Sequence, residues 1–289
     1  MSNMRRSRFV MVDGIKTHYT ESGGNGPVIL AMHGGGHGSS GEAGLGRLLE
    51  LLGDRYRVIG LDSIGGYGKT DPVPMRHGLQ SRVDHAVAFA DALCLDRFTI
   101  MGNSQGAWCA ARYAMSYPER IENVVLLSSI TIGGAMGLKA PRGEGHKLLS
   151  SYDGTRAAMV RLMQGLAARP EVITDALVDL RQAAATRPGA MGAFAASEKS
   201  IAAVRSDPLA TALFDMRESL PALAKKIATI FIWGENDIFA APSHGRELEA
   251  LLPDIKFHWI EKAGHQVQTD QPEIVAGIVD NLIRQTQPR

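Results

Sequence analysis

The sequence predicts an α/β fold: a mainly parallel sheet with helices on both faces and a helical insertion. Short apolar runs that end near glycine alternate with segments of helical spacing, which is typical of strands that are buried on both faces. The alternation stops after Ile132 and resumes near residue 226. A chain of 289 residues is long enough for one such domain with a substantial core.

The first half of the chain opens with a predicted hairpin and continues with alternating strands and helices. Residues 7–23 contain two strand-like runs around Asp13-Gly14, a dipeptide typical of a two-residue hairpin turn. The predicted strands that follow are 27–34, 55–63, 97–104 and 121–129, and the predicted helices are 84–95 and 107–118.

Residues 134–208 form a predicted helical lid between the two halves of the core. This segment is rich in alanine, methionine and arginine, contains no strand-like run, and has helix breaks at Pro170, Pro188 and Pro208. The core is expected to comprise residues 1–133 and 209–289. Its later elements are predicted strands at 226–237 and 255–266 and predicted helices at 242–253 and 272–285.

Composition and charge argue against several classes of protein. A net charge of +1 gives no overall field that would attract nucleic acid or an anionic membrane, and no apolar run approaches the roughly 18 to 20 residues of a membrane span. Cys94 and Cys109 provide neither a disulfide framework nor a metal-ligand spacing, so we expect a cytoplasmic protein without a metal. No apolar signal segment follows the basic residues near the start, where we expect a short disordered lead-in: Arg5, Arg6 and Arg8.

A serine stands between two glycines at a predicted strand-to-helix turn, in the run Gly102 to Gly106 (GNSQG). Glycines there allow the tight approach of two backbone segments, and the serine hydroxyl projects above the carboxyl edge of the sheet. The amino end of the following helix presents free amides that favour a developing negative charge. This context predicts that Ser104 is a nucleophile.

A serine hydroxyl needs a base to take its proton and a carboxylate to orient that base. Asp237 follows the strand-like run at 228–234, and His265 follows the run at 257–263. The order serine, acid, histidine, each just past a strand, is that of an α/β-hydrolase. Glu235 is a weaker candidate for the acid because it lies two residues nearer the strand.

The glycine-rich run His33 to Gly36 (HGGG) follows another predicted strand, and we interpret it as part of an oxyanion hole. Gly34 and Gly35 would donate from one side and the amide of Gln105 from the other; the alternative is an ordinary flexible turn.

Residues 63–70 (SIGGYGKT) are similar to the end of a phosphate-binding loop. Ser63 replaces the leading glycine there, and DPVP follows where that loop requires a helix, so nucleotide binding is not expected.

With these motifs the chain is similar to the α/β-hydrolases over nearly its full length, and it resembles the meta-cleavage product hydrolases in particular. Those enzymes split carbon–carbon bonds in ring-fission products of aromatic degradation. The segments that carry the resemblance are HGGGHG, LDSIGGYGKTD, GNSQGA and GENDIF. The resemblance implies a Ser-Asp-His hydrolase, a homodimer, no cofactor, and a small-molecule substrate of the 2-hydroxy-6-oxohexa-2,4-dienoate type.

The same resemblance implies that Asn103 and an arginine of the lid help to hold the dienoate end of the substrate. Arg181 fits, because it lies on the apolar stripe of a helix that Thr174 can cap, where a guanidinium must snorkel, pair with a buried acid or face a carboxylate in a cleft. The other members of that stripe are Ile173, Ala176, Leu177, Leu180 and Ala184. Gln266 stands where the family has a tryptophan that lines the dienoate pocket, so we expect Gln266 at this pocket.

Two alternatives stay open at this point. The same triad would serve a serine esterase, lactonase or amidase acting on a small apolar substrate, because these reactions differ from carbon–carbon cleavage only in the leaving group. The fold could also serve as a ligand receptor or scaffold with a decayed site, although the intact set of Ser104, Asp237 and His265 argues against this.

Overall fold

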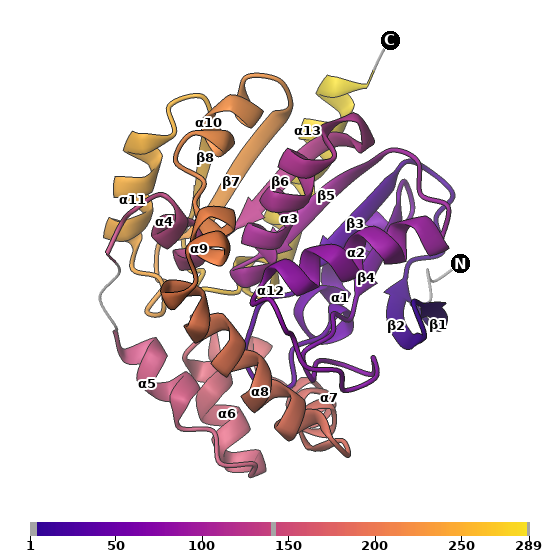
Figure 1. Ribbon diagram of the computed structural model, residues 1–289, viewed down its shortest axis with the longest axis vertical. Coiled ribbons are helices and arrows are strands. Elements are labelled where there is room, and N and C mark those ends of the chain that lie inside the picture. Colours follow the sequence, from indigo (N-terminus) through magenta and orange to yellow (C-terminus); the bar gives the residue numbers. More distant parts are fainter. Residues whose placement is uncertain (1–4, 140–142, 288–289) are drawn as a thin grey trace.

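The computed structural model describes residues 5–139 and 143–287, through which one sheet runs with the strand order β1-β2-β4-β3-β5-β6-β7-β8 (Figure 1). Strands β3 to β8 are parallel, whereas β2 is antiparallel to both β1 and β4. The predicted mainly parallel α/β fold is therefore confirmed. The strands are β1 Arg6–Val12, β2 Ile15–Glu21, β3 Val28–Met32, β4 Arg57–Leu61, β5 Phe98–Asn103, β6 Ile121–Leu127, β7 Ala228–Gly234 and β8 Lys256–Ile260.

Both faces of the sheet are covered by helices, because successive side chains of each buried strand point to opposite faces. In β3, Leu30 and Met32 pack on one side, whereas Ile29 and Ala31 pack on the other. The first face is covered by α2 Gln80–Ala92, α3 Gln105–Ser116, α4 Ile130–Ala135, α10 Ser219–Ala224 and α11 Pro242–Leu251. The second is covered by α1 Gly41–Leu52, α12 Val267–Asp270 and α13 Pro272–Thr286.

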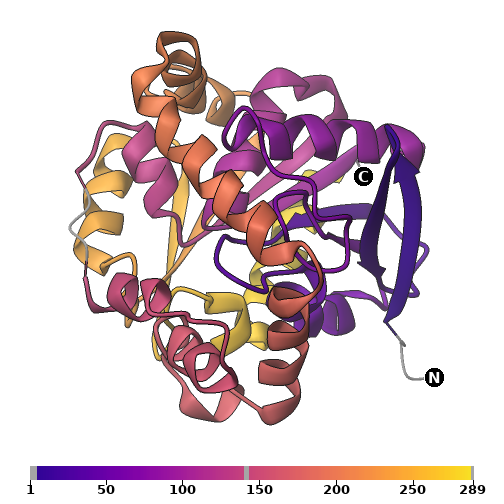
Figure 2. The same ribbon diagram turned by 60° about the horizontal axis from the view of Figure 1, so that its bottom comes forward.

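The chain between β6 and β7 is helical wherever the structure assigns it a regular element, and part of it lies beyond one end of the sheet. Figures 1 and 2 show α5 to α8 gathered there. A separate apolar cluster that includes Met159, Leu162 and Val178 joins α6 to α7. The helices are α5 Glu144–Ser150, α6 Arg156–Gln164, α7 Asp175–Thr186, α8 Ala190–Ala203 and α9 Pro208–Phe214. The division at residues 134 and 208 into core and lid stays a prediction, and residues 140–142 of that lid lie outside the described part.

The predicted amino-terminal hairpin is confirmed, and its turn has the positive φ angles that Asp-Gly favours, +48° at Asp13 and +80° at Gly14. The expected disordered lead-in is wrong for the three arginines. Arg6 and Arg8 belong to β1, and Arg5 forms an ion pair with Glu50 at 3.1 Å.

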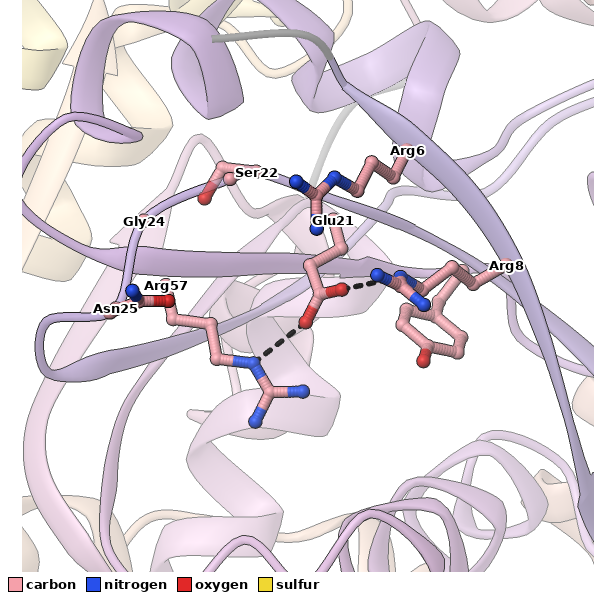
Figure 3. Close-up of a pocket in the computed structure, with 9 residues that line it drawn as sticks. Arg6, Arg8, Glu21, Ser22, Gly24, Asn25 and Arg57 are labelled. Atoms are coloured by element: carbon pink, nitrogen blue, oxygen red, sulfur yellow. Dashed lines mark hydrogen bonds and ion pairs between the residues drawn. The ribbon is translucent and has the colours of Figure 1, made fainter.

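Glu21 forms an ion-pair cluster that includes Arg8 of β1. The Glu21 carboxylate accepts from Arg8 Nε and from Arg57 Nε, each at 2.7 Å, beside a pocket that Arg6 also lines (Figure 3). Arg57 begins β4, so this pocket lies at the amino edge of the parallel strands, away from the strand ends that carry the predicted catalytic residues. The cluster fastens the hairpin to the sheet.

A buried hydrogen-bond chain forms a second attachment of the hairpin. His18 of β2 joins Asp62 Oδ2 through Nδ1 at 2.7 Å and Ser7 Oγ through Nε2 at 2.7 Å. The Asp62 carboxylate also accepts from the backbone amides of Gly41 and Lys69. One carboxylate thus connects β2, the start of α1 and the loop after β4.

No described helix is long and apolar enough to cross a membrane.

Candidate active site

Ser104 occupies the turn between β5 and α3 in a backbone conformation that side-chain-bearing residues rarely adopt, with φ +56° and ψ −119°. The flanking glycines permit this turn. A Cβ added at Gly102 would lie 2.1 Å from the carbonyl oxygen of Gly106, and one added at Gly106 would lie 2.4 Å from that of Met32. The Ser104 backbone is fixed further because its amide donates to Leu127 O and its carbonyl accepts from Ser129 Oγ.

His265 and Asp237 form a buried pair in the loops that follow β8 and β7. His265 Nδ1 lies 2.9 Å from Asp237 Oδ2, while Asp237 Oδ1 accepts from the amides of Phe239 and Ala240 at 2.8 and 2.7 Å. This leaves His265 Nε2 buried without a hydrogen-bond partner among the described residues. The rival acid, Glu235, instead forms a surface ion pair with Arg246 at 2.9 Å.

Gly34 and Gly35 lie directly against the turn that carries Ser104. A Cβ added at Gly34 would be 3.3 Å from the Ser104 Cβ, and one added at Gly35 would be 2.6 Å from the Gln105 side chain. Gln105 is the first residue of α3, so its amide lies at the helix amino terminus. The three residues predicted for the oxyanion hole are therefore side by side, although their role as donors stays a prediction.

His33 and Arg82 support this glycine-rich loop from behind. His33 Nδ1 donates to Gly34 O at 2.7 Å and Nε2 accepts from the Ser63 amide at 3.1 Å, which defines a neutral ring. Burial and then the nearby Arg82 charge lower the His33 pKa to about 3. The Arg82 guanidinium donates to His33 O at 2.5 Å and to Gln105 Oε1 at 3.3 Å. Arg82, a charged residue on the inner face of α2, could not be identified from the sequence.

A cavity of about 170 Å³ lies in front of Ser104. Seven of the predicted site residues line it: Gly34, Gly35, Asn103, Ser104, Gln105, His265 and Gln266. Apolar side chains such as Leu149, Phe194 and Phe239 complete the wall together with Thr131 and Glu198, which the sequence did not single out. The described residues contain no group of His, Cys, Asp or Glu side chains placed to hold a metal ion.

Arg181 is fully buried and adjoins the cavity through the backbone of Gly36. A Cβ added at Gly36, a lining residue, would lie 3.4 Å from Arg181 Nη2. The guanidinium donates to His37 O at 3.1 Å and to Ser39 Oγ at 3.0 Å, but Nη1 has no partner among the described residues. No described carboxylate pairs with it, and burial lowers its pKa to about 10.

The helix that carries Arg181 begins as predicted, with Thr174 Oγ1 accepting from the Leu177 amide at 3.3 Å. The predicted apolar stripe is partly wrong, because Ala176 is exposed and the inner face of α7 contains Val178, Arg181, Ala184 and Ala185. Packing of Val178 and Ala185 in the α6–α7 cluster rotates the helix relative to the expected stripe.

Asn103 and Gln266 both line the cavity, and Asn103 also has a structural task. Its side-chain nitrogen donates to Leu127 O at 3.2 Å and to His265 O at 3.0 Å. Asn103 therefore joins the Ser104 turn to residues 261–266, called the histidine loop below. The backbone amide of Gln266 donates to Leu166 O at 2.8 Å, so the histidine loop is attached to the segment that follows α6. Contact of either side chain with a dienoate stays a prediction.

Asp270, which the sequence did not reveal, strengthens the same attachment. Its carboxylate accepts from the amide of Gly264 at 2.7 Å and from those of Ala168 and Arg169 at 2.9 and 3.0 Å. Asp270 therefore holds the residue before His265 against the segment after α6.

Comparison with known proteins agrees with this geometry. The model of the α/β hydrolase fold family matches residues 27–272. A 2-hydroxy-6-oxononadienedioate/2-hydroxy-6-oxononatrienedioate hydrolase of Paraburkholderia xenovorans is 31% identical over 92% of this chain and 91% of that protein. A 2-hydroxy-6-oxo-2,4-heptadienoate hydrolase of Pseudomonas putida is 29% identical over 97% of each chain. The crystal structure of a meta-cleavage product hydrolase from Pseudomonas fluorescens superposes with a TM-score of 0.77 and 26% identity over 97% of this chain and 98% of that one.

The fold, the strand-end positions of the predicted triad and these similarities lead to the same assignment. The chain belongs to the α/β-hydrolase fold family, and it is similar over nearly its full length to hydrolases of meta-cleavage products.

Proposed function

We propose that this protein is a serine hydrolase that cleaves a carbon–carbon bond in a 2-hydroxy-6-oxohexa-2,4-dienoate type ring-fission product of aromatic degradation. The observation that carries the proposal is the buried, carboxylate-free guanidinium of Arg181 beside the cavity of Ser104 and His265. A buried cation with a free donor favours an anionic ligand, and a dienoate supplies a carboxylate. The names of the relatives support the same substrate class.

The residues have distinct tasks in the proposed reaction. The dienol first ketonises. His265 Nε2 then takes a proton from Ser104 Oγ or from a water molecule, and the oxygen that has lost its proton attacks the 6-carbonyl carbon. Asp237 holds the imidazole through Nδ1 and stabilises its charged form. The amides near Gly34, Gly35 and Gln105 receive the oxyanion. When the carbon–carbon bond breaks, its electron pair leaves with the dienoate half, which takes the proton from His265. When Ser104 is the nucleophile, the acyl half stays on its Oγ until water hydrolyses this ester and Ser104 regains its proton. In either case the acyl half leaves as a carboxylic acid.

Three further features belong to the proposal. Residues 134–208 act as a lid that carries Arg181, and Asn103 and Gln266 contact the dienoate. The protein works as a cytoplasmic homodimer on a small molecule, with no nucleic-acid or membrane partner. The resemblance suggests the dimer, and composition suggests the location.

The absorbance of the coloured dienolate tests this function. We expect the wild-type protein to bleach it, and Ser104→Ala to lower the rate by at least about a thousandfold, because the attacking hydroxyl is lost. Ser206→Ala, a change at an exposed serine, is the matched control and should bleach at the wild-type rate. No bleaching by the wild type across alkyl and aryl 6-substituents would contradict the proposal.

A further inference from the structure

Helix α8 is held in a fixed position over the cavity by hydrogen bonds on both sides of Glu198. Ser197 Oγ accepts from the Met75 amide at 2.9 Å and donates to Ala193 O at 2.7 Å. Ser200 Oγ accepts from the Gly78 amide at 2.9 Å. These bonds connect α8 to the loop that leads into α2, so the position of the Glu198 backbone does not depend on its own side chain.

Phe194 and Glu198 are one helical turn apart, and therefore share a face of α8. Both line the cavity in front of Ser104, Phe194 as part of its apolar wall and Glu198 as a polar group. Among the described residues that line this cavity, Glu198 is the one with a carboxyl group. Nothing in the proposed cleavage reaction uses that group.

The surroundings of Glu198 differ from those of Arg181. The charge that acts on Glu198 is Arg82, which lies behind Gln105 and donates to Gln105 Oε1 and His33 O. Burial raises the Glu198 pKa and Arg82 opposes this rise. Arg181 instead lies beside Gly36, near His37, Ser39 and Leu149. Arg181 therefore adjoins the cavity behind Gly36, whereas Glu198 lines the cavity directly and lies near a different arginine, Arg82.

An extended substrate that passes Ser104 places its two halves in different parts of this cavity. When Arg181 holds the carboxylate of the dienoate half, the group on the 6-carbonyl falls to the remaining part, which Glu198 lines. We infer that Glu198 selects the acyl half of the substrate, favouring acyl groups with a cationic or hydrogen-bond-donating end and excluding those that end in a carboxylate. This inference rests on the proposed function. Glu198 is an exposed residue that lines the cavity, and repulsion between like charges held close together supplies the physical reason.

Three acyl groups of matched shape test the inference: 5-methylhexanoyl, glutaryl and 4-(trimethylammonio)butyryl, which end in a neutral, an anionic and a cationic group. Each is presented as a p-nitrophenyl ester and as the 6-acyl part of a dienoate, and kcat/KM is measured at pH 8. We expect the wild type to disfavour glutaryl by at least about tenfold relative to 5-methylhexanoyl and to favour the cationic group.

Glu198→Gln keeps the shape of the side chain and removes its charge. This variant should raise kcat/KM for glutaryl by at least about tenfold while changing 5-methylhexanoyl by less than about twofold. Lys199→Gln alters the adjacent exposed charge of α8, outside the cavity lining, and should leave all three ratios unchanged.

The two substrate series separate this inference from the proposed function. If the esters show the shift with Glu198→Gln but no dienoate is bleached, carbon–carbon cleavage fails and the selectivity of Glu198 stands. If Glu198→Gln leaves the glutaryl ratio at its wild-type value in the esters, the inference is overturned, whatever the dienoates show.

Discussion

At the scale of single residues, the buried guanidinium of Arg181 lacks both a balancing negative charge and an acceptor for Nη1 among the described residues. Removing a guanidinium from water is costly unless its donors are used and its charge is balanced. His37 O and Ser39 Oγ use part of this capacity, and Nη1 is left over. A substrate carboxylate would supply both the missing acceptor and the missing charge.

Arg181→Met separates carbon–carbon cleavage from the esterase alternative. We expect kcat/KM for the dienoate to fall at least about a hundredfold, because a bidentate or charge-assisted contact to its carboxylate is lost. Uncharged p-nitrophenyl esters should change by less than about threefold. Arg161→Met, at an exposed arginine of α6, should leave both activities unchanged. Esters hydrolysed far faster than any dienoate, with no effect of Arg181→Met on either, would favour the esterase.

At the scale of elements, the histidine loop is held by a segment about a hundred residues earlier in the chain. Asp270 joins Gly264 to Ala168 and Arg169, and Leu166 O receives the amide of Gln266. The position of His265 therefore depends on the helical segment as well as on β8.

Asp270→Asn tests this dependence. An amide nitrogen in place of one carboxylate oxygen would face a backbone N–H instead of accepting from it, so we expect a loss of about 1 to 3 kcal/mol in the free energy of unfolding. We also expect kcat to fall more than KM changes, because His265 is displaced while the cavity wall is retained. Urea unfolding and steady-state kinetics measure the two effects. Asp254→Asn, at an exposed position, serves as control, and unchanged kcat in Asp270→Asn would refute the coupling.

Elements defined by local pattern could be predicted from the sequence, whereas contacts between distant segments could not. The strands, the Asp13-Gly14 turn and the Thr174 cap depend on neighbouring residues and were predicted. The inner face of α7 depends on which helix it meets, so Ala176 was misplaced. Asp270 acquires its role from amides about a hundred positions away, which no periodicity records.

At the scale of the whole molecule, several histidines are held neutral inside the fold. Burial and then the charge of Arg82 lower the pKa of His33 to about 3 and that of His85 to about 4. In the unfolded chain these rings titrate near pH 6.5. Below that pH the unfolded chain binds protons that the native state does not, so stability is lost as the pH falls from about 6.5 toward 4 and 3.

We therefore expect the free energy of unfolding to fall by roughly 4 kcal/mol between pH 7 and pH 5 through these two side chains. Urea unfolding at a series of pH values measures the slope. His85→Gln should remove about half of it, whereas His77→Gln, at an exposed ring, should leave it unchanged. A slope that His85→Gln does not alter would show that other groups cause the acid sensitivity.

The chain from Ser7 through His18 to Asp62 has a consequence for protein engineering. Without β2, Asp62 would lose His18 and yet stay buried between α1 and the loop after β4, where an unpaired carboxylate is costly. Shortened or circularly permuted versions that omit the first two strands would therefore lose more than an edge of the sheet. Fusion partners are better placed after α13, because the last turn of that helix is exposed.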